Sequence, residues 1–273
     1  MRPGDKPTPL VNLYEVKSDG RRKVRTIVLG NRVQKGEDEN NYAPVVDMTT
    51  LRVLLGRIVN EQLYTCGCDI SEAYLNAALE ERVVVRPPEE YRKRSGFGYW
   101  VPKRAVYGLR QSPAAWDKHM HEKLLTLGWR RSSVDACYYT KQTPQGTVHM
   151  LCYVDDYLLT GPAQELVENE RNKILELFPR GGRKLDPDES GTLRFLGLDI
   201  TFAHALGEVR VSQATLIATV AERFGLADAG PAKAKKPFEG FLNEEGTPAP
   251  PGNEYRSIVG SLMYLAVNTR IDI

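Results

Sequence analysis

The chain has 273 residues, 41% hydrophobic and 26% charged, with a formal net charge of +2, as is typical of a globular protein with one large core or two modest cores. The low net charge argues against a protein that coats nucleic acid over its whole surface. Because no apolar run approaches the ~20 residues of a membrane-spanning helix and the N-terminus lacks the apolar middle of a secretory signal, we expect an intracellular protein without a membrane partner.

The N-terminal part of the chain predicts a β-hairpin. Two strand-like runs, LVNLYEVK and RKVRTIVLG, flank the turn residues Ser18, Asp19 and Gly20. Lys23 and Arg25 lie two residues apart in the second run, so strand alternation places both side chains on one face. Residues 21–35 contain several basic side chains and no acidic one, which indicates either a phosphate-binding patch or solvated surface charges.

The rest of the chain mixes helices and strands. Apolar periodicity predicts helices over residues 47–60, from Ser112 to Gly128, and over 163–178, 213–224 and 254–268, and SEAYLNAALEE after Asp69 also has helical composition. Strands are predicted in the run that ends at Asp69, in VVVRPPEEY, in residues 134–141 and 147–154, and in a pair around Gly207. Residues 226–253 hold five prolines and predict a flexible connection. Because strands and helices do not alternate regularly, we expect an α+β fold.

Three aspartates stand at the ends of predicted strands. Asp155 and Asp156 lie between the apolar runs HMLCYV and YLLTG, and Asp69 ends YTCGC, with no adjacent basic residue for any of them. A buried carboxylate needs a cation, a basic partner or a proton. Oxygen ligands suit Mg²⁺, and three aspartates that meet would suit phosphoryl transfer by two ions ~3.5–4 Å apart. The alternative is a hairpin turn that happens to use two aspartates.

Several motifs then carry a family resemblance. The string YVDD at residues 153–156 resembles the YxDD signature of reverse transcriptases. The segments collinear with it are KVRTIVLG, YAPVVDMTTLRVLL, CDISEAYLNAALEE, AVYGLRQSPAAW, RFLGLDI and YRSIVGSLMYLAVNTRIDI. Together they resemble the polymerase region of the Pol polyprotein of copia-type (Pseudoviridae) LTR retrotransposons, over about residues 10–273. The family usually has Phe where Tyr74 stands and often Pro where Ile271 stands.

The resemblance implies a right-hand polymerase with fingers, palm and thumb, whose antiparallel palm sheet carries the YVDD hairpin. Fingers and palm would occupy residues 1–212, with the fingers hairpin at about 10–35 and the palm at about 60–90 and 130–212. A thumb-like helix and a flexible connection would occupy 213–252, and 253–273 would begin the connection towards ribonuclease H. Because no ribonuclease H sequence precedes Ile273, we expect a polyprotein fragment or a decayed genomic copy.

The resemblance also implies RNA- and DNA-directed DNA synthesis with an RNA template, a DNA primer and deoxynucleoside triphosphates, in the cytoplasm within virus-like particles, with later nuclear entry. Asp69 and Asp155 would be the principal ligands of two Mg²⁺ ions, for which Mn²⁺ could substitute, and Asp156 would complete the cluster. The implied nucleotide-binding residues are Lys23 and Arg25 at the triphosphate, Tyr74 against the sugar 2′ position, and Gln111 at the nucleotide or template.

Each of these roles has an alternative. Lys23 and Arg25 could be exposed strand charges, and Tyr74 could be a core aromatic residue. For the whole chain, the alternatives are a truncated inactive remnant that at most binds nucleic acid and an unrelated Mg²⁺-dependent phosphotransferase. The chain has neither a Walker-type phosphate loop nor a G-x-G-x-x-G fingerprint, which disfavours ATPase and dehydrogenase functions.

Overall fold

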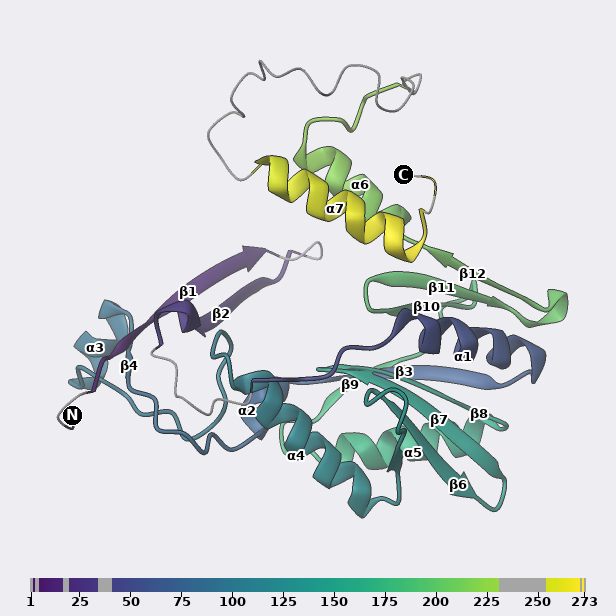
Figure 1. The fold of residues 1–273 in the computed structure, drawn as a ribbon, viewed down its shortest axis with the longest axis horizontal. Coiled ribbons are helices and arrows are strands. Elements are labelled where there is room, and N and C mark those ends of the chain that lie inside the picture. Colours follow the sequence, from purple (N-terminus) through teal and green to yellow (C-terminus); the bar gives the residue numbers. More distant parts are fainter. Residues whose placement is uncertain are drawn as a thin grey trace.

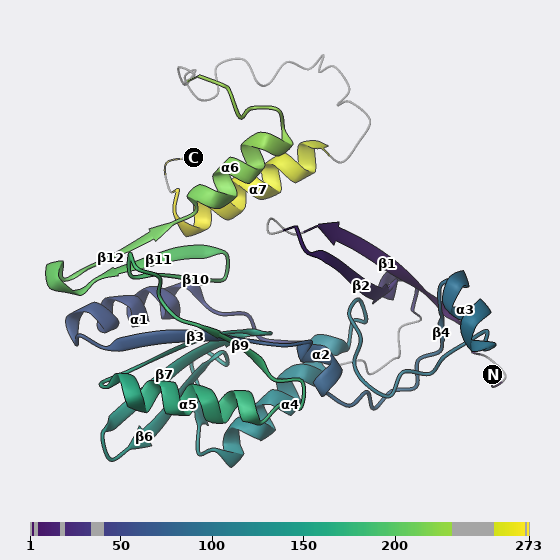
Figure 2. The ribbon, with the colours of Figure 1, turned by 180° about the vertical axis from the view of Figure 1, so that it is seen from behind.

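A computed structural model of the protein describes residue 2 and residues 5–16, 20–33, 41–230, 254–270 and 272. Its centre is a six-stranded antiparallel sheet with the strand order β5-β6-β7-β8-β3-β9. The strands are β3 (Tyr64–Ile70), β5 (Arg130–Arg131), β6 (Tyr138–Thr143), β7 (Gly146–Tyr153), β8 (Asp156–Gly161) and β9 (Gly182–Leu185). Figures 1 and 2 show α4 (Ser112–Thr126) and α5 (Gln164–Glu176) on one side of this sheet, and α1 (Met48–Asn60) on the other.

Strand alternation divides the hydrophobic core between the two faces of the sheet. Met150 and Leu159 point to the face where they pack with Trp116 of α4 and Ile174 of α5. Their strand neighbours Leu151 and Leu158 point to the opposite face, where they pack with the buried leucines of α1. Because both faces of the sheet are covered, the sequences of β7 and β8 are nearly continuous apolar runs. Charged residues occur at the turn between these strands.

The predicted N-terminal hairpin is confirmed. β1 (Thr8–Val16) and β2 (Arg22–Val28) are antiparallel, with Leu10 opposite Val28, and β4 (Val85–Arg86) adds to β1 in parallel. The turn residues Ser18 and Asp19 lie outside the described residues. A third, small core joins this region to the segment before α4, and α3 (Glu89–Ser95) contacts its edge where Tyr91 packs on Trp100. The buried members of this core are Leu10, Val28, Val83, Val85 and Leu109.

A second three-stranded sheet carries the C-terminal helices. Its strands are β10 (Thr192–Phe195), β11 (Leu198–Ala203) and β12 (Glu208–Ser212), followed by α6 (Ala214–Arg223) and α7 (Glu254–Asn268). The two helices lie side by side above this sheet in both views (Figures 1 and 2), and the Tyr264 hydroxyl donates a hydrogen bond to the Leu196 carbonyl (2.8 Å). The predicted helices at both positions are confirmed, whereas residues 231–253 of the predicted connection lie outside the described residues.

Two other predictions need correction. The helix expected in SEAYLNAALEE is one turn only, α2 (Ala73–Asn76). Glu72 enters it with φ +50°, and the Asn76 amide donates to the carbonyls of Ser71 and Glu72, so the turn is closed instead of propagated. In VVVRPPEEY the strand is limited to Val85–Arg86, because the two prolines lead directly into α3.

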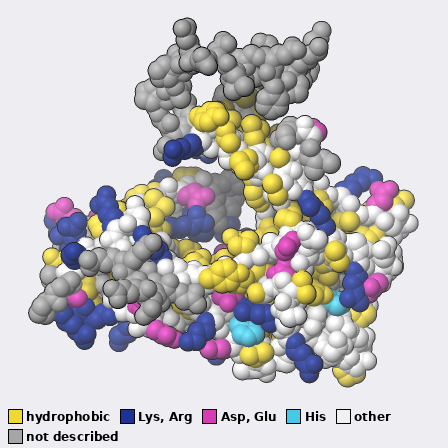
Figure 3. Space-filling view, in the orientation of Figure 1, with side chains coloured by type: hydrophobic (Ala, Val, Ile, Leu, Met, Phe, Trp, Pro, Cys, Tyr) yellow, Lys and Arg dark blue, Asp and Glu magenta, His cyan; other side chains and the backbone are white. Residues whose placement is uncertain are grey.

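The predicted α+β class and the antiparallel sheet with the YVDD hairpin are confirmed. Figure 3 shows hydrophobic side chains gathered over the α6–α7 pair, and Lys and Arg side chains gathered over the end of the molecule that carries α3. In the part of the chain that the structure describes, no helix has the length and apolarity needed to cross a membrane.

The buried histidine of β7 leads us to expect that the stability of the fold depends on pH. His149 is 3% exposed, its ring stacks on that of Tyr138, and its Nδ1 lies 2.7 Å from the Tyr138 hydroxyl. Burial, with a further contribution from the Arg57 charge, lowers the pKa of His149 from 6.5 to about 4, while Glu61 acts in the opposite direction. Below pH 6.5 the unfolded chain therefore binds a proton that the folded chain excludes until about pH 4.

The contribution of His149 to stability is therefore complete above pH 6.5 and is lost progressively as the pH falls towards 4. The expected loss in the free energy of unfolding is about 2 kcal/mol at pH 5. Urea unfolding at pH 8 and pH 5 should show a smaller loss for His149→Gln than for the unmodified chain. Equal losses in the two proteins would show that this histidine is not the group responsible.

Candidate active site

The YVDD hairpin has an unusual turn. Tyr153 pairs with Asp156, so Val154 and Asp155 form a two-residue connection, and Val154 has φ +55°. A β-branched residue rarely adopts this conformation, which costs on the order of 1–3 kcal/mol unless the surroundings impose it. Here the Trp116 indole Nε1 donates a hydrogen bond to the Val154 carbonyl (2.6 Å), which holds the turn against α4.

The third aspartate meets this hairpin across the sheet. β3 lies beside β8, and in their antiparallel register Asp69 is directly opposite Asp156. One residue further, the Ile70 N–H donates to the Asp155 carbonyl (2.8 Å). The residues Asp69, Asp155 and Asp156 therefore lie together at one end of adjacent strands, although 86 residues separate the first from the second.

The ionised forms of two of these carboxyl groups are disfavoured by their surroundings. Burial raises the pKa of Asp155, and the charge of Asp69 raises it further. Burial also raises the pKa of Asp156 to about 6, with added repulsion from Asp155 and Asp69. A divalent cation would stabilise the ionised carboxylates, because its charge offsets the cost of their burial and the repulsion between them.

The side chains are partly engaged with other groups as the structure stands. Asp69 Oδ2 accepts from Arg183 Nη2 (3.0 Å), and the charge of Arg183 and the Leu196 backbone both lower the pKa of Asp156 against the stronger effect of burial. Accordingly, within the described ranges no group of three or more His, Cys, Asp or Glu side chains forms a ready metal cluster. Arg183 of β9 was missed by sequence reasoning, because its contact with Asp69 depends on sheet pairing across 114 residues.

The cations of the β1–β2 hairpin act on this site. The positive charges of Lys23 and Arg25 both lower the pKa of Asp155, against the stronger effect of burial. In the strand register Lys23 lies opposite Glu15 and Arg25 lies opposite Leu13, and strand alternation places both basic residues on one face of β2. Arg25 Nη1 also pairs with Glu15 Oε2 (3.1 Å), and both side chains are about half exposed.

Two tyrosines flank the aspartates. Tyr74 of α2 packs edge to face on Tyr107, with ring centroids 4.7 Å apart and an interplanar angle of 61°. Burial raises the pKa of Tyr74 to about 12, and the negative charge of Asp155 contributes to the rise. Tyr74 also packs against the core beneath the sheet. Sequence reasoning did not single out Tyr107; its only signal was its place in the AVYGLRQSPAAW motif.

Gln111 has a different environment. Its side chain is 7% exposed, Nε2 donates to Glu81 Oε2 (3.0 Å), and Oε1 is buried without a hydrogen-bond partner among the described residues. It lines a hollow of about 630 Å³ with Ala114, Lys118 and Glu122 of α4. The structure therefore places Gln111 in contact with Glu81, and a role at the nucleotide would require its amide to leave that partner.

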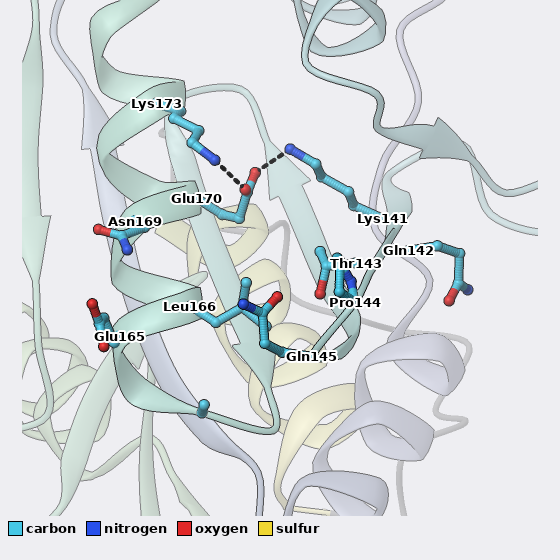
Figure 4. Close-up of a pocket in the computed structure, with 11 residues that line it drawn as sticks. Lys141, Gln142, Thr143, Pro144, Gln145, Glu165, Leu166, Asn169, Glu170 and Lys173 are labelled. Atoms are coloured by element: carbon cyan, nitrogen blue, oxygen red, sulfur yellow. Dashed lines mark hydrogen bonds and ion pairs between the residues drawn. The ribbon is translucent and has the colours of Figure 1, made fainter.

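A second hollow, of about 460 Å³, lies between α5 and the β6–β7 turn (Figure 4). The buried carboxylate of Glu170 accepts hydrogen bonds there from Lys141 (2.5 Å) and Lys173 (2.7 Å). These pairs satisfy the buried charge. The cluster is thus explained by the attachment of α5 to the sheet.

The contact between Trp116 and the hairpin gives a testable prediction. Trp116→Phe keeps an aromatic ring against Phe178 but removes the donor to the Val154 carbonyl. A typical hydrogen bond contributes about 0.5–1.5 kcal/mol, and the Val154 carbonyl is partly buried, so the free energy of unfolding should fall by about that amount and the strained turn should relax. Urea unfolding measures the loss. A variant as stable as the unmodified chain would show that this hydrogen bond does not support the turn.

The geometry described above defines a class of protein. The six-stranded antiparallel sheet with its aspartate hairpin, the β1–β2 hairpin beside it and the C-terminal helices have the arrangement of a right-hand polymerase (Figure 1). A family profile described as reverse transcriptase (RNA-dependent DNA polymerase) matches residues 2–237. The chain belongs to this family.

Individual relatives confirm the copia-type resemblance. The chain is 29% identical to the retrovirus-related Pol polyprotein from transposon TNT 1-94 of Nicotiana tabacum, over 99% of this chain and 21% of that protein. It is 30% identical to the corresponding polyprotein from transposon RE1 of Arabidopsis thaliana, over 94% of this chain and 17% of that protein. It thus spans about a fifth of the length of these relatives. A solved structure of telomerase from Candida albicans is also similar, at 11% identity and a TM-score of 0.42. The match includes 75% of this chain and 45% of the telomerase chain.

Proposed function

We propose that this chain is the polymerase region of a copia-type reverse transcriptase and extends a DNA primer on an RNA or a DNA template. The observation that supports it most strongly is the meeting of Asp69, Asp155 and Asp156 at one end of the palm sheet. The proposed division has fingers and palm within residues 1–212, a thumb-like helix and connection in 213–252, and the start of a further connection in 253–273.

The three carboxylates suit two Mg²⁺ ions. Asp69 and Asp155 would be the principal ligands, and Asp156 would complete the cluster, with Mn²⁺ as a substitute. When bound, the ions would lower the pKa of the primer 3′-hydroxyl and stabilise the leaving oxygen of pyrophosphate. The chain fits this role because two desolvated, mutually repelling carboxylates favour a cation, and Asp69 can exchange Arg183 for one.

The cations of the fingers hairpin would bind the triphosphate. The charges of Lys23 and Arg25 already lower the pKa of Asp155, so both side chains are within electrostatic reach of the proposed metal site. Ammonium and guanidinium donors would offset the charge that develops on the phosphates during transfer. Arg25 would leave Glu15, an exchange favoured by the greater charge of a triphosphate.

Two further side chains would contact the nucleotide. Tyr74 would lie against the sugar 2′ position and exclude a hydroxyl group there. Gln111 would contact the nucleotide or template once its amide leaves Glu81.

Primer extension tests the proposal directly. The chain should add deoxynucleotides to a DNA primer annealed to an RNA template, should lose this activity with EDTA, and should regain it with Mg²⁺ or Mn²⁺. A folded chain that binds primer–template in a salt-sensitive way but incorporates no nucleotide would contradict the proposal and would instead fit a remnant that only binds nucleic acid.

A further inference from the structure

The orientation of Tyr74 depends on its neighbours. It lies on α2, which is a single turn of four residues entered through the left-handed Glu72. One hydrogen-bonded turn is only marginally stable, so the helix cannot hold the Tyr74 side chain by itself. The edge-to-face contact with Tyr107, at 4.7 Å between centroids, is the aromatic contact of Tyr74 in the described structure.

Tyr107, in contrast, is anchored through its backbone. The Val28 N–H at the end of β2 donates to the Tyr107 carbonyl (2.8 Å). The next residue, Gly108, has φ +90° and lies so close to β2 that an added Cβ would be 2.1 Å from the Val28 carbonyl oxygen. Gly30 meets the Gly108 carbonyl in the same way, at 1.9 Å. Two backbone segments therefore cross in direct contact beside Tyr107.

The backbone just before Tyr107 is also held by hydrogen bonds to the start of α4. The Ser112 hydroxyl accepts from the Val106 N–H (3.0 Å) and donates to the Val106 carbonyl (2.6 Å). Tyr107 is thus held between β2 of the fingers and the first turn of α4. Replacing its side chain leaves all of these backbone contacts in place.

The phenol of Tyr107 lies within the electrostatic reach of the site. Burial raises the pKa of Tyr107, Asp155 raises it further, and Arg25 lowers it. The ring is therefore near both a proposed metal ligand and a proposed triphosphate contact.

We propose that Tyr107 is a positioning residue that holds the ring of Tyr74 in place, and that it thereby sets the discrimination between deoxyribonucleotides and ribonucleotides. The inference rests on the proposed polymerase function and deepens it. A close crossing of two glycine-containing segments supports Tyr107, and Tyr107 in turn packs on Tyr74 of the one-turn helix α2. The backbone of the fingers thus contributes to sugar selection without touching the sugar.

The test measures kcat/KM for one deoxynucleotide and for the matching ribonucleotide, on the full chain with primer–template. Edge-to-face pairs contribute enough energy for Tyr107→Ala and Tyr107→Leu to reduce the ratio of the two values about threefold to tenfold. Tyr107→Phe keeps the ring and should keep the ratio. Tyr91→Ala is the matched control, because Tyr91 packs edge to face on Trp100 in the fingers (6.1 Å) and should not affect the ratio.

A double-mutant cycle separates positioning from a general loss of structure. If Tyr107 acts through Tyr74, Tyr107→Leu should have no further effect on the ratio in a Tyr74→Ala background. An unchanged ratio in Tyr107→Leu, or equal effects of Tyr107→Leu in both backgrounds, would overturn the inference while leaving the polymerase proposal intact. A wild-type chain that incorporates no nucleotide would overturn the polymerase proposal, and this inference with it.

Discussion

Asp155→Asn is expected to abolish primer extension while the chain remains folded. The substitution removes the charge with which Asp155 would hold a cation between the hairpin and Asp69. Because metal ligation contributes several kcal/mol of transition-state stabilisation, the rate of single-nucleotide incorporation should fall by ~10³-fold or more. Rapid-quench measurement of that rate, with saturating Mg²⁺ and nucleotide, tests the expectation.

Stability should change in the opposite direction to activity. Burial and the charge of Asp69 disfavour the ionised form of Asp155, as its raised pKa shows, so a neutral isostere should unfold at the same or a higher urea concentration. Asp228→Asn, an exposed aspartate beyond α6, is the matched control and should leave both quantities unchanged. An Asp155→Asn chain that extends primers like the unmodified protein would exclude the proposed catalytic role.

Gly108→Ala is expected to be strongly destabilising. A Cβ at this position would be 2.1 Å from the Val28 carbonyl oxygen, and the backbone φ of +90° is unfavourable for alanine. The clash and the strain together should lower the free energy of unfolding by on the order of 3 kcal/mol or more. The hairpin that carries Lys23 and Arg25 would also shift, so KM for the nucleotide should rise.

The matched control is Gly98→Ala in the same region. An added Cβ there meets no atom within 4 Å, so its effect on stability should stay within about 0.5 kcal/mol. Urea unfolding and nucleotide titration of both variants test the comparison. Equal stability of Gly108→Ala and Gly98→Ala would show that the crossing with β2 is not tight in solution.

The helices that the sequence predicts well are those with an apolar stripe facing the sheet. The stripe from Leu51 to Val59 predicts α1 within one residue at its start, because burial on a single face imposes the 3.6-residue period. The same reasoning fails after Asp69. There the helical composition of SEAYLNAALEE is overridden by the left-handed Glu72 and by the side-chain hydrogen bonds of Asn76, which composition does not reveal.

The candidate site was predictable to the extent that it lies in local motifs. Asp155 and Asp156 share one hairpin, and Asp69 ends a strand whose neighbour could be inferred from family resemblance. Arg183 and Tyr107 could not be inferred from local pattern, because each reaches the site through strand pairing or backbone crossing between distant segments. Gln111 is the opposite case: it lies in a motif that the sequence identifies, but in the structure its amide is bound to Glu81.

The most direct test of the account is the location of metal ions in a crystal of the chain with primer–template, a non-hydrolysable deoxynucleotide and Mn²⁺. Anomalous scattering from manganese reports the ion positions without reference to activity. If the two-metal site forms, manganese will be ligated by the carboxylates of Asp69 and Asp155. Manganese bound elsewhere, with Asp69 still paired with Arg183 or the two carboxylates separated from each other, would contradict this site.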